Sequence, residues 1–241
     1  MTPKDIAQLL AEDIRDHNGL LLEADHLNLP EILQAHPTLP NVLREYGIDP
    51  EKLQILGSGD RGTAFSDGGP YICKITSDLA EAKASLTIQG VDIPGVAKVV
   101  YAARLARRVG GEPLYLVIQE RANISISARE KKIAGLVGDY LIMQKQWPFD
   151  PNEATRKIYI DAYKRTGENL QSPDATNEIS QLLGAVLNLH KNGVVYYDVS
   201  GENIGKDKKG NYCVFDLGVS TSRGGVLPVV EAILDDCAII F

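Results

Sequence analysis

One stretch, residues 179–220, constrains the fold of this chain more than any other part of the sequence. Apolar residues recur at steps of three and four from Ile179, which predicts a helix with one buried face that ends at Asn192-Gly193. A short apolar run then leads to Asp198, and Asn203 follows on the same loop. Strands are predicted around 207–209 and at 211–215, and Asp216-Leu217-Gly218 comes directly after the second.

This order of elements resembles the catalytic loop and the metal-binding loop of the protein-kinase superfamily. Asp198 and Asn203 are five residues apart, as in the family motif, and Asp216 follows at about the family's spacing. The resemblance implies that Asp198 is a catalytic residue beside the acceptor hydroxyl and that Asn203 and Asp216 bind Mg²⁺. Phosphoryl transfer depends mainly on such positioning and charge neutralisation. The alternative is a polar hairpin followed by a tight turn.

A glycine-rich segment lies between two predicted strands, 53–56 and 63–65. Because a strand rather than a helix is expected after it, the G-x-G-x-x-G pattern disfavours a dinucleotide-binding turn. The pattern suits the glycine-rich hairpin of the kinase family, whose backbone N–H groups close over the phosphates of a nucleotide. The resemblance therefore implies that ATP is bound by Gly57, Ser58, Gly59, Asp60, Arg61 and Gly62.

Lys74 lies in the next predicted strand, 70–75. A cation in a half-buried strand needs an anionic partner, because burying it unpaired is costly. The resemblance implies that Lys74 is a catalytic residue that contacts the ATP phosphates and pairs with a helix glutamate. Glu81 is the only glutamate of the helix expected after Ser77-Asp78, and it comes earlier than in the family pattern. Alternatively, Lys74 extends to solvent at a strand edge and Glu81 interacts only with the helix dipole.

Two further strands are predicted at 101–105 and 114–118. By the resemblance, the segment after the second strand is the hinge between two lobes, and its backbone near Glu120 and Ala122 would face the adenine. Helices are predicted at 125–143, where Gly135 and Gly138 weaken the pattern, and at about 152–165.

The sequence also departs from the common kinase pattern. Tyr196-Tyr197 replaces the family's His-Arg, so no arginine is present there to receive an activation-loop phosphate. Ser200 takes the place of the usual lysine. A serine at this position resembles the loop of atypical kinases of the RIO type. Residues 219–241 are too few for an activation segment and the helices after it. The resemblance thus implies a compact atypical member with a truncated C-lobe.

The predicted fold is therefore α+β, with a bilobal protein-kinase-like arrangement. Residues 1–48 are expected to form an N-terminal helical extension, 49–122 a small β-rich N-lobe, and 123–241 a shortened helical C-lobe. The extension is expected to begin with a helix capped by Thr2, and the C-lobe to end with a helix at 227–234.

Composition limits the classes of partner and the compartment. The formal net charge is −7 and no long Lys/Arg run occurs, which argues against general nucleic-acid binding. The three cysteines form no C-x-x-C pair and are expected to be buried thiols in a reducing compartment. Residues 1–17 lack the features of a signal peptide, and no segment approaches a membrane-spanning length, so a cytoplasmic protein is expected.

The resulting hypothesis is an ATP- and Mg²⁺-dependent phosphotransferase, an atypical kinase that acts on protein serine or threonine. One alternative is a small-molecule kinase of aminoglycoside-phosphotransferase-like design, a class that usually lacks so complete a glycine loop. Another is a nucleotide-binding pseudokinase or ATPase switch that docks a partner through its N-terminal helices. Retention of the charged positions at 74, 198 and 216 argues against a dead site.

Overall fold

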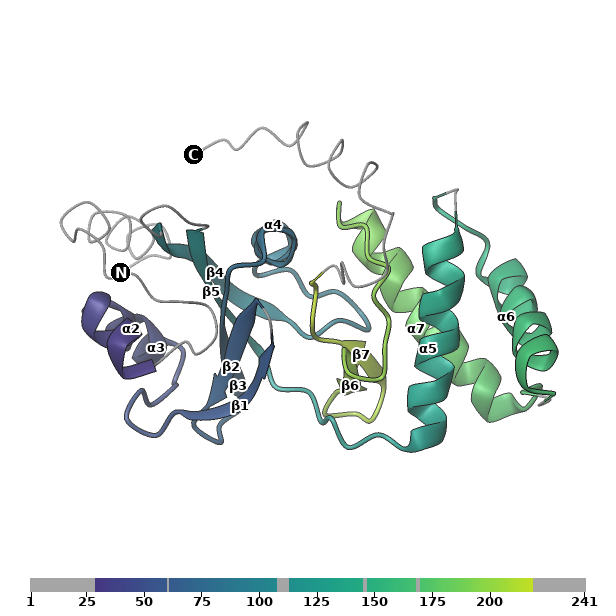
Figure 1. Cartoon of the computed structure of the whole chain (residues 1–241), viewed down its shortest axis with the longest axis horizontal. Helices are drawn as coiled ribbons and strands as arrows, with labels where there is room; N and C mark the ends of the chain where they lie inside the picture. The colour runs from purple at the N-terminus through teal and green to yellow at the C-terminus, as the bar shows by residue number, and fades with distance from the viewer. Residues whose placement is uncertain (1–28, 60, 108–112, 145–146, 168–169, 219–241) are drawn as a thin grey trace.

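The computed structural model describes residues 29–59, 61–107, 113–144, 147–167 and 170–218, which have an α+β architecture (Figure 1). One antiparallel sheet has the strand order β1-β2-β3-β5-β4, and a separate two-stranded hairpin follows later in the chain. The strands are β1 (Gln54–Gly59), β2 (Gly62–Ser66), β3 (Tyr71–Thr76), β4 (Val99–Arg107), β5 (Pro113–Glu120), β6 (Ile204–Lys206) and β7 (Tyr212–Val214). The helices are α2 (Leu29–Ala35), α3 (Leu39–Glu45), α4 (Leu79–Ile88), α5 (Ala128–Met143), α6 (Pro151–Thr166) and α7 (Pro173–Lys191).

The glycine-rich segment is the tip of the hairpin that joins β1 and β2. Gly59 pairs with Gly62, and Gly62 also pairs with Thr76 of β3. A Cβ at Gly62 would lie only 2.8 Å from the carbonyl oxygen of Ile75, so this close approach of two strands requires glycine. The predicted strand after the glycines is therefore confirmed.

Two hydrophobic clusters cover opposite faces of the sheet. One joins α2 and α3 to the sheet through Ile32, Leu43, Phe65 and Leu116. The other joins α4 and the opposite face of the sheet to α5, α6, α7 and the β6–β7 hairpin. Figure 1 shows the same order, with α2 and α3 at one end of the molecule and α5 to α7 at the other. The apolar residues of α2 and α3 are thus used inside the fold.

Several predicted boundaries need correction. The strand predicted around 207–209 is wrong, because β6 ends at Lys206 and the following residues form the turn of the hairpin. Asp207 explains the error, since its side chain accepts hydrogen bonds from the N–H groups of Lys209 and Asn211, and Gly210 takes φ +83°. The helix predicted from 125 begins at Ala128, because Ser127 caps it.

Other expectations concern cysteines, termini and membrane helices. Cys73 and Cys213 are buried free thiols, as predicted, and burial raises the pKa of each to about 12. Within the described ranges, no helix has both the length and the apolar character needed to span a bilayer. Cys237, the helix predicted after Thr2 and the helix predicted at 227–234 lie outside the described residues.

Close packing explains why α5 contains Gly138, a residue with poor helix propensity. A side chain at Gly138 would overlap the carbonyl oxygen of Val199, whereas nothing lies within 4 Å of a Cβ placed at Gly135. Gly138 therefore lets α5 pack directly against the loop that carries Asp198.

The two glycines of α5 make a matched pair for mutation. Gly135→Ala is expected to raise the free energy of unfolding by about 1 kcal/mol through helix propensity alone. Gly138→Ala is expected to lower it by about 1–3 kcal/mol, because the overlap with Val199 outweighs the same propensity gain. Urea unfolding of both variants measures the difference. Equal stabilisation by both substitutions would contradict the close contact.

Candidate functional site

Lys74 connects three elements that are far apart in the sequence. Its Nζ lies 2.7 Å from Glu81 Oε1 on α4 and 2.9 Å from Asp216 Oδ2, which follows β7. The Lys74 side chain is 17% exposed and that of Glu81 is 5% exposed. The structure therefore brings together Lys74 and the glutamate predicted as its partner, and adds Asp216 to the same cluster.

The early position of Glu81 follows from the start of α4. Only Ser77 and Asp78 separate β3 from this helix, and the Asp78 side chain accepts hydrogen bonds from the N–H groups of Ala80 and Glu81. Glu81 is thus held in the first turn, next to the strand that carries Lys74.

The charges of this cluster influence one another. Burial lowers the pKa of Lys74, but the negative charges of Glu81 and Asp216 outweigh burial and leave it above its ordinary value. Burial raises the pKa of Glu81 to about 7, although Lys74 opposes this shift. Above about pH 7 one ammonium therefore faces two carboxylates, and this excess of negative charge favours a further cation at the site.

The loop of Asp198 is bound to the segment of Asp216 through backbone groups. The Asn203 side chain donates a hydrogen bond to the Asp198 carbonyl oxygen at 3.0 Å, and the Phe215 N–H donates to the Asn203 carbonyl oxygen at 3.1 Å. The Tyr196 hydroxyl lies 2.6 Å from the Asp198 carbonyl oxygen and 2.7 Å from that of Asp216. Asp198, Asn203 and Asp216 are therefore fixed relative to one another.

Two residues of this region were missed by sequence reasoning. Tyr196 is 1% exposed and joins the two loops through its hydroxyl; the only signal was its place two residues before Asp198. Gln119, 4% exposed, donates from its side-chain amide to the Phe215 carbonyl oxygen at 2.7 Å. This contact joins the end of β5 to the segment of Asp216, and no local pattern signals it.

Backbone hydrogen bonds attach the predicted hinge, residues 120–123, to neighbouring segments at both of its ends. The N–H groups of Glu120 and Arg121 donate to the carbonyl oxygens of Lys98 and Pro70, and Asn123 forms an isolated bridge with Lys206. A Cβ at Gly205 would lie 2.9 Å from the Cβ of Ala122, so β6 packs closely on this segment. Glu120 and Ala122 therefore lie on a restrained connection between the sheet and the helical part of the chain.

The predicted nucleotide-binding glycines lie on the β1–β2 hairpin. Gly57, Ser58 and Gly59 belong to the exposed strand β1, and the Ser58 hydroxyl lies 3.1 Å from that of Thr63. The Arg61 carbonyl oxygen accepts a hydrogen bond from Ser77 N–H, which attaches the tip of the hairpin to the start of α4. Asp60 lies outside the described residues.

Two predicted residues have oxygen atoms that suit Mg²⁺. Among the described residues, no group of three or more His, Cys, Asp or Glu side chains is arranged to hold a metal ion. Mg²⁺ usually needs only one or two carboxylates when nucleotide phosphates supply other ligands. The Asn203 amide nitrogen is used on the Asp198 carbonyl, which leaves the amide oxygen for a metal, and Asp216 supplies a carboxylate. The oxygen donors of these two residues are of the type that suits Mg²⁺ arriving with a nucleotide.

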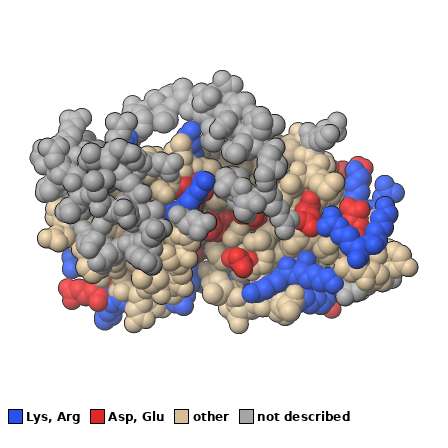
Figure 2. Space-filling view, in the orientation of Figure 1, with Lys and Arg blue, Asp and Glu red and all other residues tan. Residues whose placement is uncertain are grey.

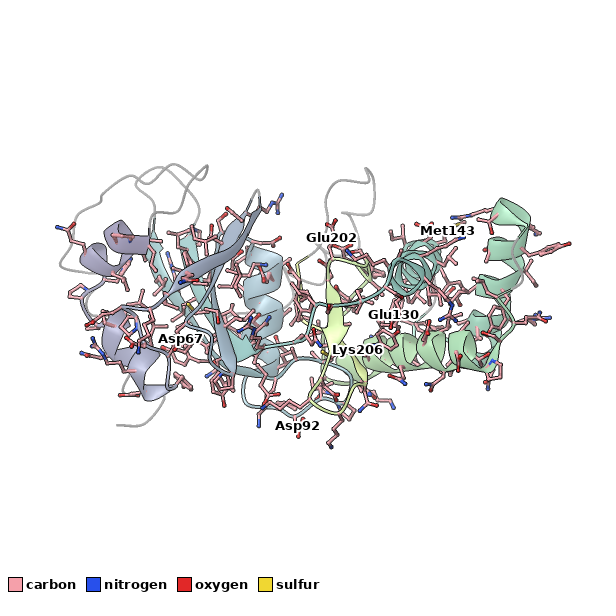
Figure 3. The ribbon with its side chains drawn as sticks, turned by 90° about the horizontal axis from the view of Figure 1, so that it is seen from below. Asp67, Asp92, Glu130, Met143, Glu202 and Lys206 are labelled. Carbon is pink, nitrogen blue, oxygen red and sulfur yellow. The ribbon has the colours of Figure 1, made fainter. Side chains whose placement is uncertain are left out.

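A second polar cluster supports this region from the first turn of α5. Glu130 Oε1 lies 2.7 Å from Lys206 Nζ and accepts a hydrogen bond from the Tyr212 hydroxyl, so it joins α5 to both strands of the β6–β7 hairpin (Figure 3). The hydrogen bonds from Lys206 and Tyr212 lower the pKa of Glu130 to about 2. The Glu130 side chain is 12% exposed and that of Lys206 is 32% exposed, so solvent screens their ion pair in part.

Glu130→Gln is expected to lower the free energy of unfolding at pH 7 by about 1–3 kcal/mol, because charge-assisted hydrogen bonds are lost. A carboxylate with a depressed pKa stabilises the fold above its ordinary pKa of 4.5 and loses that contribution as the pH falls toward 2. The difference between wild type and variant should therefore shrink below about pH 4.5 in urea titrations. Glu153→Gln is a suitable control, since its exposed pair with Lys157 should contribute less than about 0.5 kcal/mol.

Comparison with known proteins did not identify a family for this chain: the sequence matched no protein-family model and no curated protein. A functional conclusion therefore depends on the arrangement of the side chains. The two observations that matter most are the contacts of Lys74 with Glu81 and Asp216 and the backbone connections between the loops of Asp198 and Asp216.

Proposed function

We propose that this chain is an ATP- and Mg²⁺-dependent phosphotransferase with a protein-kinase-like fold, and that it phosphorylates serine or threonine of a protein. The observation that carries the proposal is the double contact of Lys74 Nζ, at 2.7 Å to Glu81 and 2.9 Å to Asp216. A lysine paired with a helix glutamate, next to an aspartate that binds metal, is the arrangement that kinases need for phosphoryl transfer.

Each residue would have a defined part in the reaction. Bound MgATP would supply the phosphoryl group and a divalent cation. Lys74 would bind phosphate oxygens, Asn203 and Asp216 would hold the metal, and the N–H groups of the β1–β2 hairpin would contact the phosphates. The Asp198 carboxylate would accept the proton of the acceptor hydroxyl as its oxygen attacks phosphorus, with ADP as the leaving group.

The order of elements along the chain supports a bilobal arrangement, because the five-stranded sheet and α4 precede residues 120–123, and α5 to α7 with the β6–β7 hairpin follow them. The sheet with α4 would form the N-lobe, and α5 to α7 with the β6–β7 hairpin would form the C-lobe, joined at Glu120 to Asn123. Figure 2 shows acidic side chains near the middle of one face, between the sheet and α5, where a metal-bound nucleotide would lie. The buried thiols Cys73 and Cys213 favour a reducing, cytoplasmic setting.

Labelled ATP tests the proposal. Purified protein is incubated with γ-labelled ATP and Mg²⁺, alone, with lysate protein, and with the small-molecule fraction of the same lysate. Label on serine or threonine of the chain or of lysate proteins is expected. Label on small metabolites would support a small-molecule kinase instead. Neither transfer nor phosphate release, together with retained nucleotide binding, would indicate a binding protein rather than an enzyme.

A further inference from the structure

Asp78 contacts three parts of the candidate site. Its Oδ1 accepts hydrogen bonds from the N–H groups of Ala80 at 2.8 Å and Glu81 at 3.2 Å, which caps α4. Its Oδ2 lies 3.6 Å from Arg61 Nη1, at the tip of the glycine-rich hairpin. A Cβ at Gly218 would also lie 3.6 Å from Asp78 Oδ2, so the carboxylate borders the segment of Asp216. Asp78 is 6% exposed.

Backbone hydrogen bonds strengthen the connection between the hairpin and α4. The Arg61 carbonyl oxygen accepts from Ser77 N–H at 2.7 Å, from the Thr76 hydroxyl at 3.1 Å and from the Ser77 hydroxyl at 3.2 Å. The same Thr76 hydroxyl accepts a hydrogen bond from Asp78 N–H at 3.0 Å. The hairpin tip and the start of α4 therefore form one hydrogen-bonded unit.

This unit reaches the charged cluster through Glu81. The Glu81 N–H is bonded to Asp78, while its carboxylate is bonded to Lys74. Because a single buried carboxylate caps the helix turn of Glu81 and faces the Arg61 guanidinium at 3.6 Å, movement of the hairpin would act on the Lys74–Glu81 pair. The short link of Ser77 and Asp78 between β3 and α4 leaves the helix little freedom to move independently.

We propose that Asp78 is a positioning residue that couples the glycine-rich hairpin to the Lys74–Glu81 pair. Oδ1 sets the first turn of α4, and Oδ2 holds Arg61 so that the hairpin and the lysine approach the nucleotide phosphates together. The catalytic consequence rests on the proposed function, but the mechanical coupling is a property of the protein without nucleotide.

Substitutions separate coupling from helix capping. Asparagine caps a helix as well as aspartate does, so Asp78→Asn retains the cap but loses the charge that faces Arg61. Arg61→Gln removes the same interaction from the other side. Each is expected to raise KM for MgATP about two- to five-fold with kcat unchanged, and the double variant should be no worse than either single one. Asp78→Ala, which also removes the cap, should lower kcat/KM about tenfold or more.

Arg44→Gln is the matched control. Arg44 lies 3.7 Å from Glu51 and its side chain is 53% exposed, against 3.6 Å and 50% for Arg61 with Asp78. Arg44→Gln should leave KM unchanged. Wild-type KM for both Asp78→Asn and Arg61→Gln would overturn the coupling and reduce Asp78 to a helix cap.

Amide hydrogen exchange tests the coupling independently of catalysis. In protein without nucleotide, Arg61→Gln is expected to speed exchange of the Ala80 and Glu81 amides about two- to five-fold, and Arg44→Gln should not. Unchanged exchange at both amides would overturn the coupling even in an active enzyme. A wild-type chain without ATP binding or turnover would overturn the proposed function, and the exchange result alone would then decide the coupling.

Discussion

Asp198→Asn is expected to lower the rate of phosphoryl transfer by about 10²–10⁴-fold, because an amide cannot accept the proton of the acceptor hydroxyl. The affinity for MgATP should change little. The structure gives the reason: the carbonyl oxygen of Asp198, rather than its carboxylate, accepts the hydrogen bonds of Asn203 and Tyr196. Substitution of the side chain therefore leaves the connections between the two loops in place.

Single-turnover transfer from γ-labelled ATP measures the rate, and calorimetric titration measures nucleotide affinity. Asp92→Asn is a control with the same change of charge at an exposed position, and Figure 3 shows Asp92 and Glu202, which belongs to the Asp198 loop, on opposite sides of the molecule. Turnover by Asp198→Asn at the wild-type rate would exclude Asp198 as the proton acceptor. A loss of ATP affinity as large as the loss of rate would point to a metal-binding role instead.

Residues of the candidate site could be proposed from the sequence where they have a fixed spacing within one local element. Asp198 and Asn203 lie on one loop, and Lys74 lies in a strand directly after the glycine-rich hairpin, so the pattern alone indicated them. Glu81 was predicted as the partner of Lys74 only because α4 has no other glutamate. The cap at Asp78, which explains why so early a position works, depends on side-chain geometry that no spacing reveals.

The residues that were missed act across long sequence separations. Gln119 and Phe215 are 96 positions apart, and their contact depends on how the sheet meets the β6–β7 hairpin. Gly138 weakened the helix pattern in the sequence, because glycine has poor helix propensity. In the fold, α5 packs so closely against Val199 that this position needs a residue without a side chain. The strand wrongly placed at 207–209 shows the opposite case, where turn chemistry at Asp207 overrode the apparent pattern.

Asp216 offers the sharpest test of the proposed metal site. Its Oδ2 contacts Lys74 and its Oδ1 accepts a hydrogen bond from Gly218 N–H. Asp216→Asn keeps an oxygen for Gly218 and leaves Lys74 its contact with Glu81, but the amide nitrogen replaces the oxygen that faced Lys74, so the variant loses one negative charge and the contact with Lys74. We expect the affinity for ATP in the presence of Mg²⁺ to fall by about 10–100-fold, as for groups that support metal binding.

The dependence on Mg²⁺ distinguishes a metal ligand from a partner of Lys74. ATP affinity of the wild type, measured by titration at increasing Mg²⁺, should rise with the metal, and Asp216→Asn should lose most of this rise. Asp198→Asn should retain it, because Asn203 and Asp216 are still present. An Asp216→Asn protein with the wild-type response to Mg²⁺ would exclude Asp216 as a metal ligand. If its ATP affinity then changed equally with and without the metal, the charge of Asp216 would act through Lys74 alone, which its 2.9 Å contact with Nζ would explain.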